Sequence, residues 1–213
     1  MSKPSFRHIL DNMIFKEIQL NEVSDYYYEM EQYNQKSQNE YSEQLRNALK
    51  ASEDGLANEE IDEYIEEFSA KKEYYKKTHA NLLRQNTFLQ IYFLFENYLN
   101  KKCELCQEIL DIDVGLKDIE GRGIKRAKIY LTKHGQITGP FSSHLWRDIS
   151  NYGKARNAIA HANSTAKNTE GEIKSLPGLI ISYKNSEIFT FTLDETFVPS
   201  CLKTVRDFVD LLK

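Results

Sequence analysis

The sequence predicts an all-α protein with a long N-terminal helical hairpin, a helical bundle and a small C-terminal β-hairpin. Apolar residues recur at helical spacing along residues 20–49 and again along residues 58–110, which indicates two long amphipathic helices. Between residues 176 and 193, β-branched and aromatic residues form two short runs typical of strands. The 213 residues suffice for one sizeable domain with an extended arm. We therefore divide the chain into an arm, residues 1–79, and a helical domain, residues 80–213.

The arm is expected to be an acidic hairpin of two helices. Asp54-Gly55 is a turn signal and Asn58 is a good N-cap, so the second helix should begin there. A straight helix covering the whole second stripe would be about 80 Å long, so we expect a break or bend within residues 78–86. Residues 22–75 contain 15 acidic and five basic residues. The arm is then either a hairpin with a solvated acidic face or a docking surface for a partner protein.

Turn and capping signals place the other elements of the helical domain. A short helix is expected before Gly135, and the next helix is capped by Ser142 or Ser143. The predicted β-hairpin turns around Asn185, and a final amphipathic helix occupies residues 198–213.

Composition and charge bear on the compartment and on the class of ligand. The chain opens without a signal-peptide pattern and has no apolar stretch as long as a membrane span, so we expect a cytoplasmic protein that does not contact membranes. Cys103 and Cys106 form one C-x-x-C without a second ligand pair, so we expect packing cysteines, no metal and no cofactor. The net charge of −4 conceals a basic region, because residues 101–160 contain 11 basic and seven acidic residues. A polyanion should bind this region.

Arg156, Asn157 and His161 are the candidate catalytic residues. On a helix, Asn157 and His161 share a face, and the long side chain of Arg156 can reach round to the same anion. Arginine presents a permanently charged fork to phosphate oxygens, and histidine exchanges protons near neutrality. Together they suit RNA cleavage in which the ribose 2′-hydroxyl is the nucleophile, so no metal-activated water is required. Spacing alone also fits a capping histidine beside a surface arginine.

The string R-N-A-I-A-H, residues 156–161, resembles the R-x4-6-H signature of the HEPN superfamily, including the asparagine that often follows the arginine. The likeness extends in the same order to the runs at residues 88–101 and 116–131, to the single-tryptophan helix leading into the motif, and to the closing hairpin and helix. It covers roughly residues 80–213, which would then form a HEPN-like helical bundle, and it leaves the acidic arm outside.

The resemblance implies a homodimer in which the motif helices of two subunits meet and form one composite site. It implies a metal-independent endoribonuclease that leaves 2′,3′-cyclic phosphate ends, in a prokaryotic toxin or anti-phage defence system, with an antitoxin or another defence protein as partner. His161 would be the acid/base group, Arg156 the phosphate ligand, and Asn157 would orient the imidazole. In HEPN toxins silenced by a nucleotidyltransferase, a tyrosine lies two positions after the histidine. Asn163 stands there in this chain, which argues against silencing at that point.

Four basic residues are candidates for RNA binding. Arg122, Lys125 and Arg126 belong to a glycine-containing loop and a helix start, and Lys154 precedes the motif. The alternative is a solvated basic surface. Two other functions fit the same residues: a non-catalytic dimerisation and partner-binding module, and a nucleotide-sensing domain that holds a phosphate without cleaving it.

Overall fold

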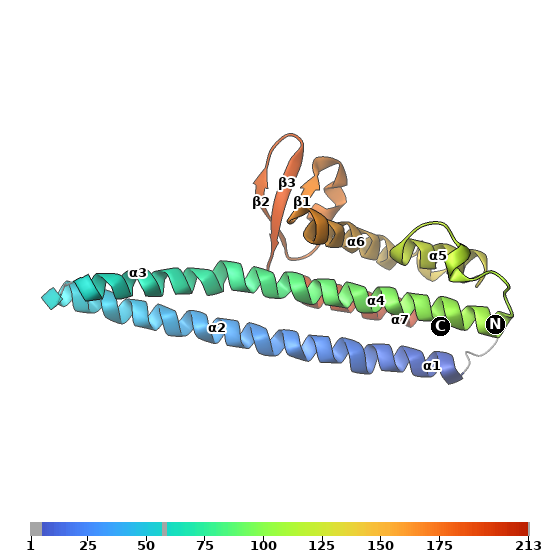
Figure 1. The fold of residues 1–213 in the computed structure, drawn as a ribbon, viewed down its shortest axis with the longest axis horizontal. Coiled ribbons are helices and arrows are strands. Elements are labelled where there is room, and N and C mark those ends of the chain that lie inside the picture. The colour runs from blue at the N-terminus through green and yellow to red at the C-terminus, as the bar shows by residue number, and fades with distance from the viewer. Residues whose placement is uncertain (1–5, 57–58, 213) are drawn as a thin grey trace. The chain divides into compact units, whose positions relative to one another are not determined.

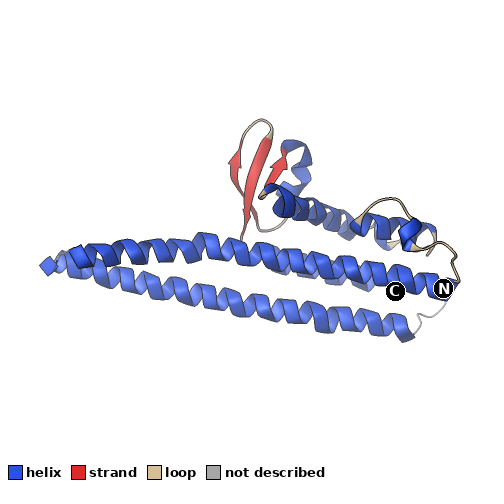
Figure 2. Cartoon of the chain, in the orientation of Figure 1, coloured by secondary structure: helices blue, strands red, loops and turns tan. Residues whose placement is uncertain are grey.

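The computed structural model describes residues 6–56 and 59–212 and is mostly helical (Figure 1). Figure 2 shows one small sheet near the C-terminal end of the sequence, so the prediction of a helical protein with a small β element is confirmed. Within the described residues, no helix combines the length and apolar character needed to cross a membrane. The helices are α1 (Phe6–Met13), α2 (Leu20–Ala51), α3 (Glu59–Glu73), α4 (Ala80–Leu110), α5 (Gly123–Lys133), α6 (His144–Ala162) and α7 (Phe197–Leu211). The strands are β1 (Thr165–Lys167), β2 (Leu179–Lys184) and β3 (Ile188–Leu193), and π-helical segments cover Ile14–Gln19, Ser52–Leu56 and Tyr74–His79.

The chain forms two compact units, which we call the hairpin unit, residues 25–86, and the motif unit, residues 1–24 together with 87–213. The predicted division at residue 79 differs from this boundary. Residues 6–24 belong to the motif unit because Phe15 and Leu20 are buried and the Phe15 ring stacks on Tyr98 at 4.3 Å between centroids. The sequence stripe beginning at residue 20 does not reveal this packing, since the preceding helix is short and partly π-helical.

The hairpin unit pairs α2 with the helical run that continues through α3 into α4. Arg84 donates two hydrogen bonds to Glu31, at 2.6 and 3.1 Å, and His79 Nδ1 lies 2.9 Å from Asn34 Oδ1. The expected break within residues 78–86 is wrong from residue 80 onward, because α4 is regular there. The irregularity in this run is the π-helical segment Tyr74–His79, which overlaps the expected range at residues 78 and 79. The predicted cap Asn58 lies outside the described residues.

The core of the motif unit lies between α4, α6 and α7. Phe88 meets Phe197 edge to face at 5.0 Å between ring centroids, and Tyr152 of α6 packs on the same Phe197 ring at 5.5 Å. Trp146 lies 5.4 Å from Phe208 and is buried. These aromatic contacts fix α6 against α4 and α7 and thereby fix the helix that carries the motif.

The sheet is antiparallel, with the strand order β1-β3-β2. The predicted β-hairpin is confirmed as β2 and β3, with Leu179 opposite Leu193. Strand β1 was not predicted; it pairs with β3 through Thr165 opposite Thr190 and directly follows α6. The sheet is therefore attached to the C-terminal end of the motif helix.

Candidate functional site

The motif occupies the last two turns of α6. Ser143 caps the helix start, since its Oγ accepts a hydrogen bond from the Trp146 backbone N–H at 3.3 Å, which confirms one of the two predicted caps. Asn163 ends the helix with a left-handed backbone (φ 48°), and its N–H and that of Ser164 both bond to the Ala158 carbonyl. His161 consequently lies in the last turn of α6.

Arg156 is held against α4. Its guanidinium lies over the Tyr92 ring at 5.6 Å from the centroid and pairs with the Glu96 carboxylate at 3.8 Å. Its Nη1 also donates a hydrogen bond of 3.0 Å to Asn157 Oδ1. The side chain is 33% exposed, so the charged fork is anchored while one part of it stays open to solvent.

His161 and Asn157 are exposed on the free side of α6. The Asn157 carbonyl oxygen is engaged by Arg156, and no hydrogen bond to His161 occurs among the described residues. The structure thus brings Arg156 and Asn157 together and leaves the imidazole one turn further along, free of intramolecular partners in the described part of the chain. Asn157 orients the guanidinium here, whereas the resemblance assigns it to the imidazole.

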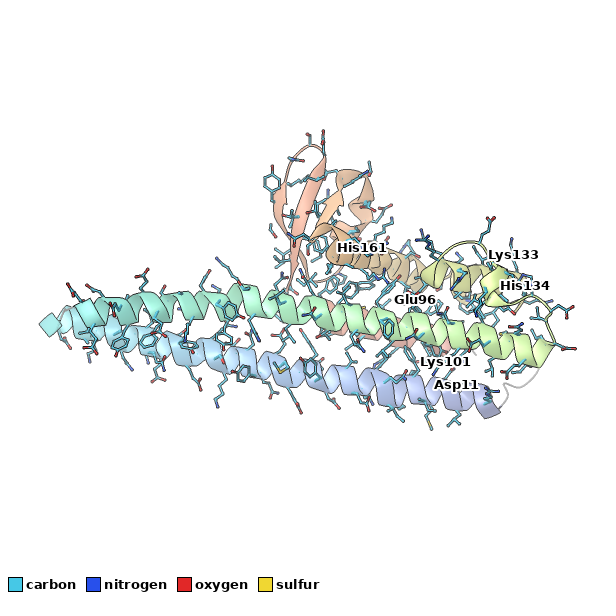
Figure 3. The ribbon with its side chains drawn as sticks, viewed as in Figure 1. Asp11, Glu96, Lys101, Lys133, His134 and His161 are labelled. Carbon is cyan, nitrogen blue, oxygen red and sulfur yellow. The ribbon has the colours of Figure 1, made fainter. Side chains whose placement is uncertain are left out.

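Glu96 is a site residue that the sequence reasoning missed. Figure 3 shows it on α4, with His161 toward the end of α6. Besides pairing with Arg156, its carboxylate lies at the start of α5, since a Cβ built on Gly123 would be 3.4 Å from Oε2. The one available signal was that Glu96 is the only acidic residue in the apolar run 88–101. A lone acid in such a run requires a cationic or hydrogen-bonding partner.

Tyr92 forms the floor under Arg156. Burial raises the pKa of its phenol well above the ordinary value; the Arg156 charge opposes this shift, while Glu96 adds to it. The ring is therefore neutral and offers Arg156 its π-face. Tyr92 also approaches the backbone of α6 closely, because a Cβ at Gly153 would lie 2.5 Å from the Tyr92 hydroxyl oxygen. Glycine at this position allows α4 and α6 to approach one another at the site.

The four predicted RNA-binding residues differ in environment. Arg122 is the exposed N-cap of α5, and Lys125 is exposed in the first turn of that helix, so both are available at the helix start beside Glu96. Arg126 is half-buried, and its Nε is buried without a hydrogen-bond partner among residues 6–56 and 59–212. Lys154 pairs with Glu172 at 3.2 Å. The start of α5 thus lies beside Glu96, the partner of Arg156, whereas Lys154 on the same helix as Arg156 is engaged by Glu172.

The cysteines have the packing role that the sequence predicts. Cys103 is buried and Cys106 half-buried, and burial raises the pKa of both thiols, that of Cys103 to about 12. Within residues 6–56 and 59–212, no group of three or more histidine, cysteine, aspartate or glutamate side chains is placed to hold a metal ion.

Comparison of this chain with family models, with curated proteins and with solved structures finds no match.

Proposed function

We propose that this protein is a HEPN-type endoribonuclease that cleaves RNA without a metal ion and serves in a prokaryotic toxin or anti-phage defence system. The observation that carries the proposal is an exposed imidazole, His161, one turn beyond an arginine that is anchored on the same helix. The resemblance of residues 156–161 to the R-x4-6-H signature also supports it. No cofactor is required for this chemistry.

The proposed reaction is an in-line displacement at phosphorus. The ribose 2′-oxygen bonds to the adjacent phosphorus as its proton passes to an imidazole, and the bond from phosphorus to the 5′-oxygen breaks. A second imidazole gives a proton to the departing 5′-oxygen, which leaves 2′,3′-cyclic phosphate and 5′-hydroxyl ends. The Arg156 guanidinium stabilises the negative charge that develops on the equatorial phosphate oxygens.

A homodimer joined through α6 supplies both imidazoles. The free side of the helix presents Asn157, Ala160 and His161, all exposed. The small side chain of Ala160 between two polar ones permits a second α6 to approach closely around a two-fold axis. Each copy then contributes one His161 and one anchored Arg156 to a shared groove, and the exposed start of α5 supplies cations for the RNA backbone.

A non-catalytic partner-binding module is the second candidate, favoured by the surface of the hairpin unit. That unit exposes five large aromatic side chains in a strongly acidic segment, and α3 has no buried residue. The aromatic residues are Tyr26, Tyr28, Tyr33, Tyr64 and Tyr74. Such a surface suits a docking protein, whether an antitoxin or another member of a defence system.

Purified protein incubated with RNA in excess EDTA tests the catalytic proposal. We expect cleavage with cyclic-phosphate ends, and a rate about 10²- to 10⁴-fold lower for His161→Ala, because an acid/base group is lost. His144→Ala is the matched control, since His144 is exposed at the opposite end of the same helix, and it should cleave normally. Equal cleavage by wild type and His161→Ala would remove His161 from the mechanism. No cleavage by either would favour the partner-binding module.

A further inference from the structure

Phe93 is an exposed aromatic side chain on a helix that otherwise buries its aromatic residues. It is 57% exposed, whereas its neighbours Tyr92 and Phe95 are 6% and 0% exposed. Among the phenylalanines whose side chains the structure describes it is the only exposed one, and no other large apolar side chain in that set is more exposed. A phenylalanine in this position contributes little to the core, so its ring is available to a ligand.

Phe93 is close in sequence to two residues of the candidate site. Phe93 adjoins Tyr92, the floor under Arg156, and precedes Glu96 by three positions, so it shares a helix surface with the carboxylate that pairs with Arg156. The rise along α4 between Phe93 and Glu96 is about 4.5 Å. The spacing along α4 therefore places Phe93 one turn from Glu96, the residue that pairs with Arg156.

The chemistry of this surface fits an unpaired nucleotide. Aromatic faces stack on bases of any sequence, while cations track the phosphates on either side. Arg122 and Lys125 are exposed at the start of α5, beside Glu96, and supply such cations. In a duplex each base is already stacked on both faces and paired at its edge. Only a single strand, a loop or a bulge can offer a base to Phe93.

We infer that Phe93 is a stacking platform for an unpaired base next to the scissile phosphate. This inference rests on the proposed function and adds a substrate-binding residue to it. Phe93 makes no contact with the reacting atoms, and it selects RNA by conformation and not by sequence. The competing occupant of the ring is a second copy of this chain, which would cover Phe93 in a dimer interface.

Binding in a cleavage-silent protein separates these outcomes. Full-length His161→Ala protein is titrated into a fluorescein-labelled RNA of about 12 nucleotides, as a single strand and as a duplex with its complement, at one fixed salt concentration. We expect preference for the single strand and about tenfold weaker binding of it when Phe93→Ala is added, because one base stack is lost. Phe93→Trp should restore binding, and duplex binding should not change. Tyr183→Ala is the control, since Tyr183 is 55% exposed on β2, and it should bind as the parent does.

A spectroscopic signal distinguishes stacking from a general loss of structure. Trp146 is the only tryptophan and is buried, so Phe93→Trp adds a reporter at the surface. We expect single-stranded RNA to quench the new indole and to leave the parent emission unchanged. Undiminished single-strand binding by Phe93→Ala, equal losses for single strand and duplex, or absence of RNA binding by the parent would each overturn the inference. So would a shift of Phe93→Ala from dimer to monomer in sedimentation. Tight, Phe93-dependent binding without cleavage by wild type would refute the proposed nuclease and leave the stacking platform intact.

Discussion

Replacing Glu96 by glutamine tests whether the carboxylate on α4 holds Arg156 in its working position. The charges are 3.8 Å apart, which corresponds to an attraction of about 4 kcal/mol at an effective dielectric constant of 20. Both side chains are partly exposed, at 33% and 27%, and solvent reduces the net value to about 1 kcal/mol. Glutamine keeps the size of the side chain and removes its charge. We expect the free energy of unfolding to fall by about 1 kcal/mol.

The kinetic consequence has two opposing parts. Arg156 without its counter-charge should bind a substrate phosphate more tightly, so KM should fall, by up to about fivefold for 1 kcal/mol of released attraction. The freed guanidinium is no longer fixed over Tyr92, and kcat should fall about tenfold because a displacement of about 1 Å is costly in the transition state. Steady-state cleavage of a fluorogenic RNA measures both constants.

Glu108→Gln is the matched control for this variant. Glu108 also lies on α4 and pairs with an arginine, Arg7, at 2.6 Å, but both partners are largely exposed and are not part of the site. We expect normal kinetics from it. If Glu96→Gln behaved the same way, or if it raised KM at constant kcat, the assignment of Glu96 as a positioning residue would be refuted.

Two further predictions concern stability in the motif unit. Gly153→Ala should lower the free energy of unfolding by about 1 kcal/mol in urea, because overpacking against the buried Tyr92 outweighs the gain in helix propensity. Gly139→Ala is the control, because nothing lies within 4 Å of the new methyl group, and it should cause no loss from overpacking. Equal losses of stability in the two variants would contradict the close approach of α4 and α6 at Gly153. Burial lowers the pKa of the Lys102 ammonium to about 8 from 10.5, so the unfolded chain binds more protons between these values and stability rises with pH there. Between pH 8 and 10.5, the free energy of unfolding of wild type should therefore rise by up to about 3 kcal/mol relative to that of Lys102→Met. A difference between the two proteins that does not change with pH would exclude the lowered pKa.

Elements with strong local signals could be predicted from the sequence. The helix α6 begins at a serine cap and ends at an asparagine that tolerates left-handed backbone. The β-hairpin turns where Asn185 Oδ1 accepts hydrogen bonds of 2.8 Å from the N–H groups of Glu187 and Ile188. In each case the residue that directs the chain lies within a few positions of the bond it forms.

Features that depend on distant partners could not be predicted. Strand β1 has three residues and exists because it pairs with β3, after an intervening loop and strand. The role of Glu96 requires knowing which face of α4 meets α6, and an apolar run on almost all sides does not indicate this. The assignment of Arg156 and His161 to one helix followed from spacing, whereas the contact of Asn157 with Arg156 depends on rotamers that spacing does not determine.

The left-handed residues after the motif, Asn163 and Ser164, also constrain how this chain can evolve. A tyrosine at position 163 would have to occupy a backbone region that costs an ordinary side chain about 1 to 2 kcal/mol. A tyrosine there would thus destabilise the helix terminus that places His161. The left-handed backbone at position 163 therefore favours asparagine or glycine and disfavours most other side chains, whatever function those side chains could serve.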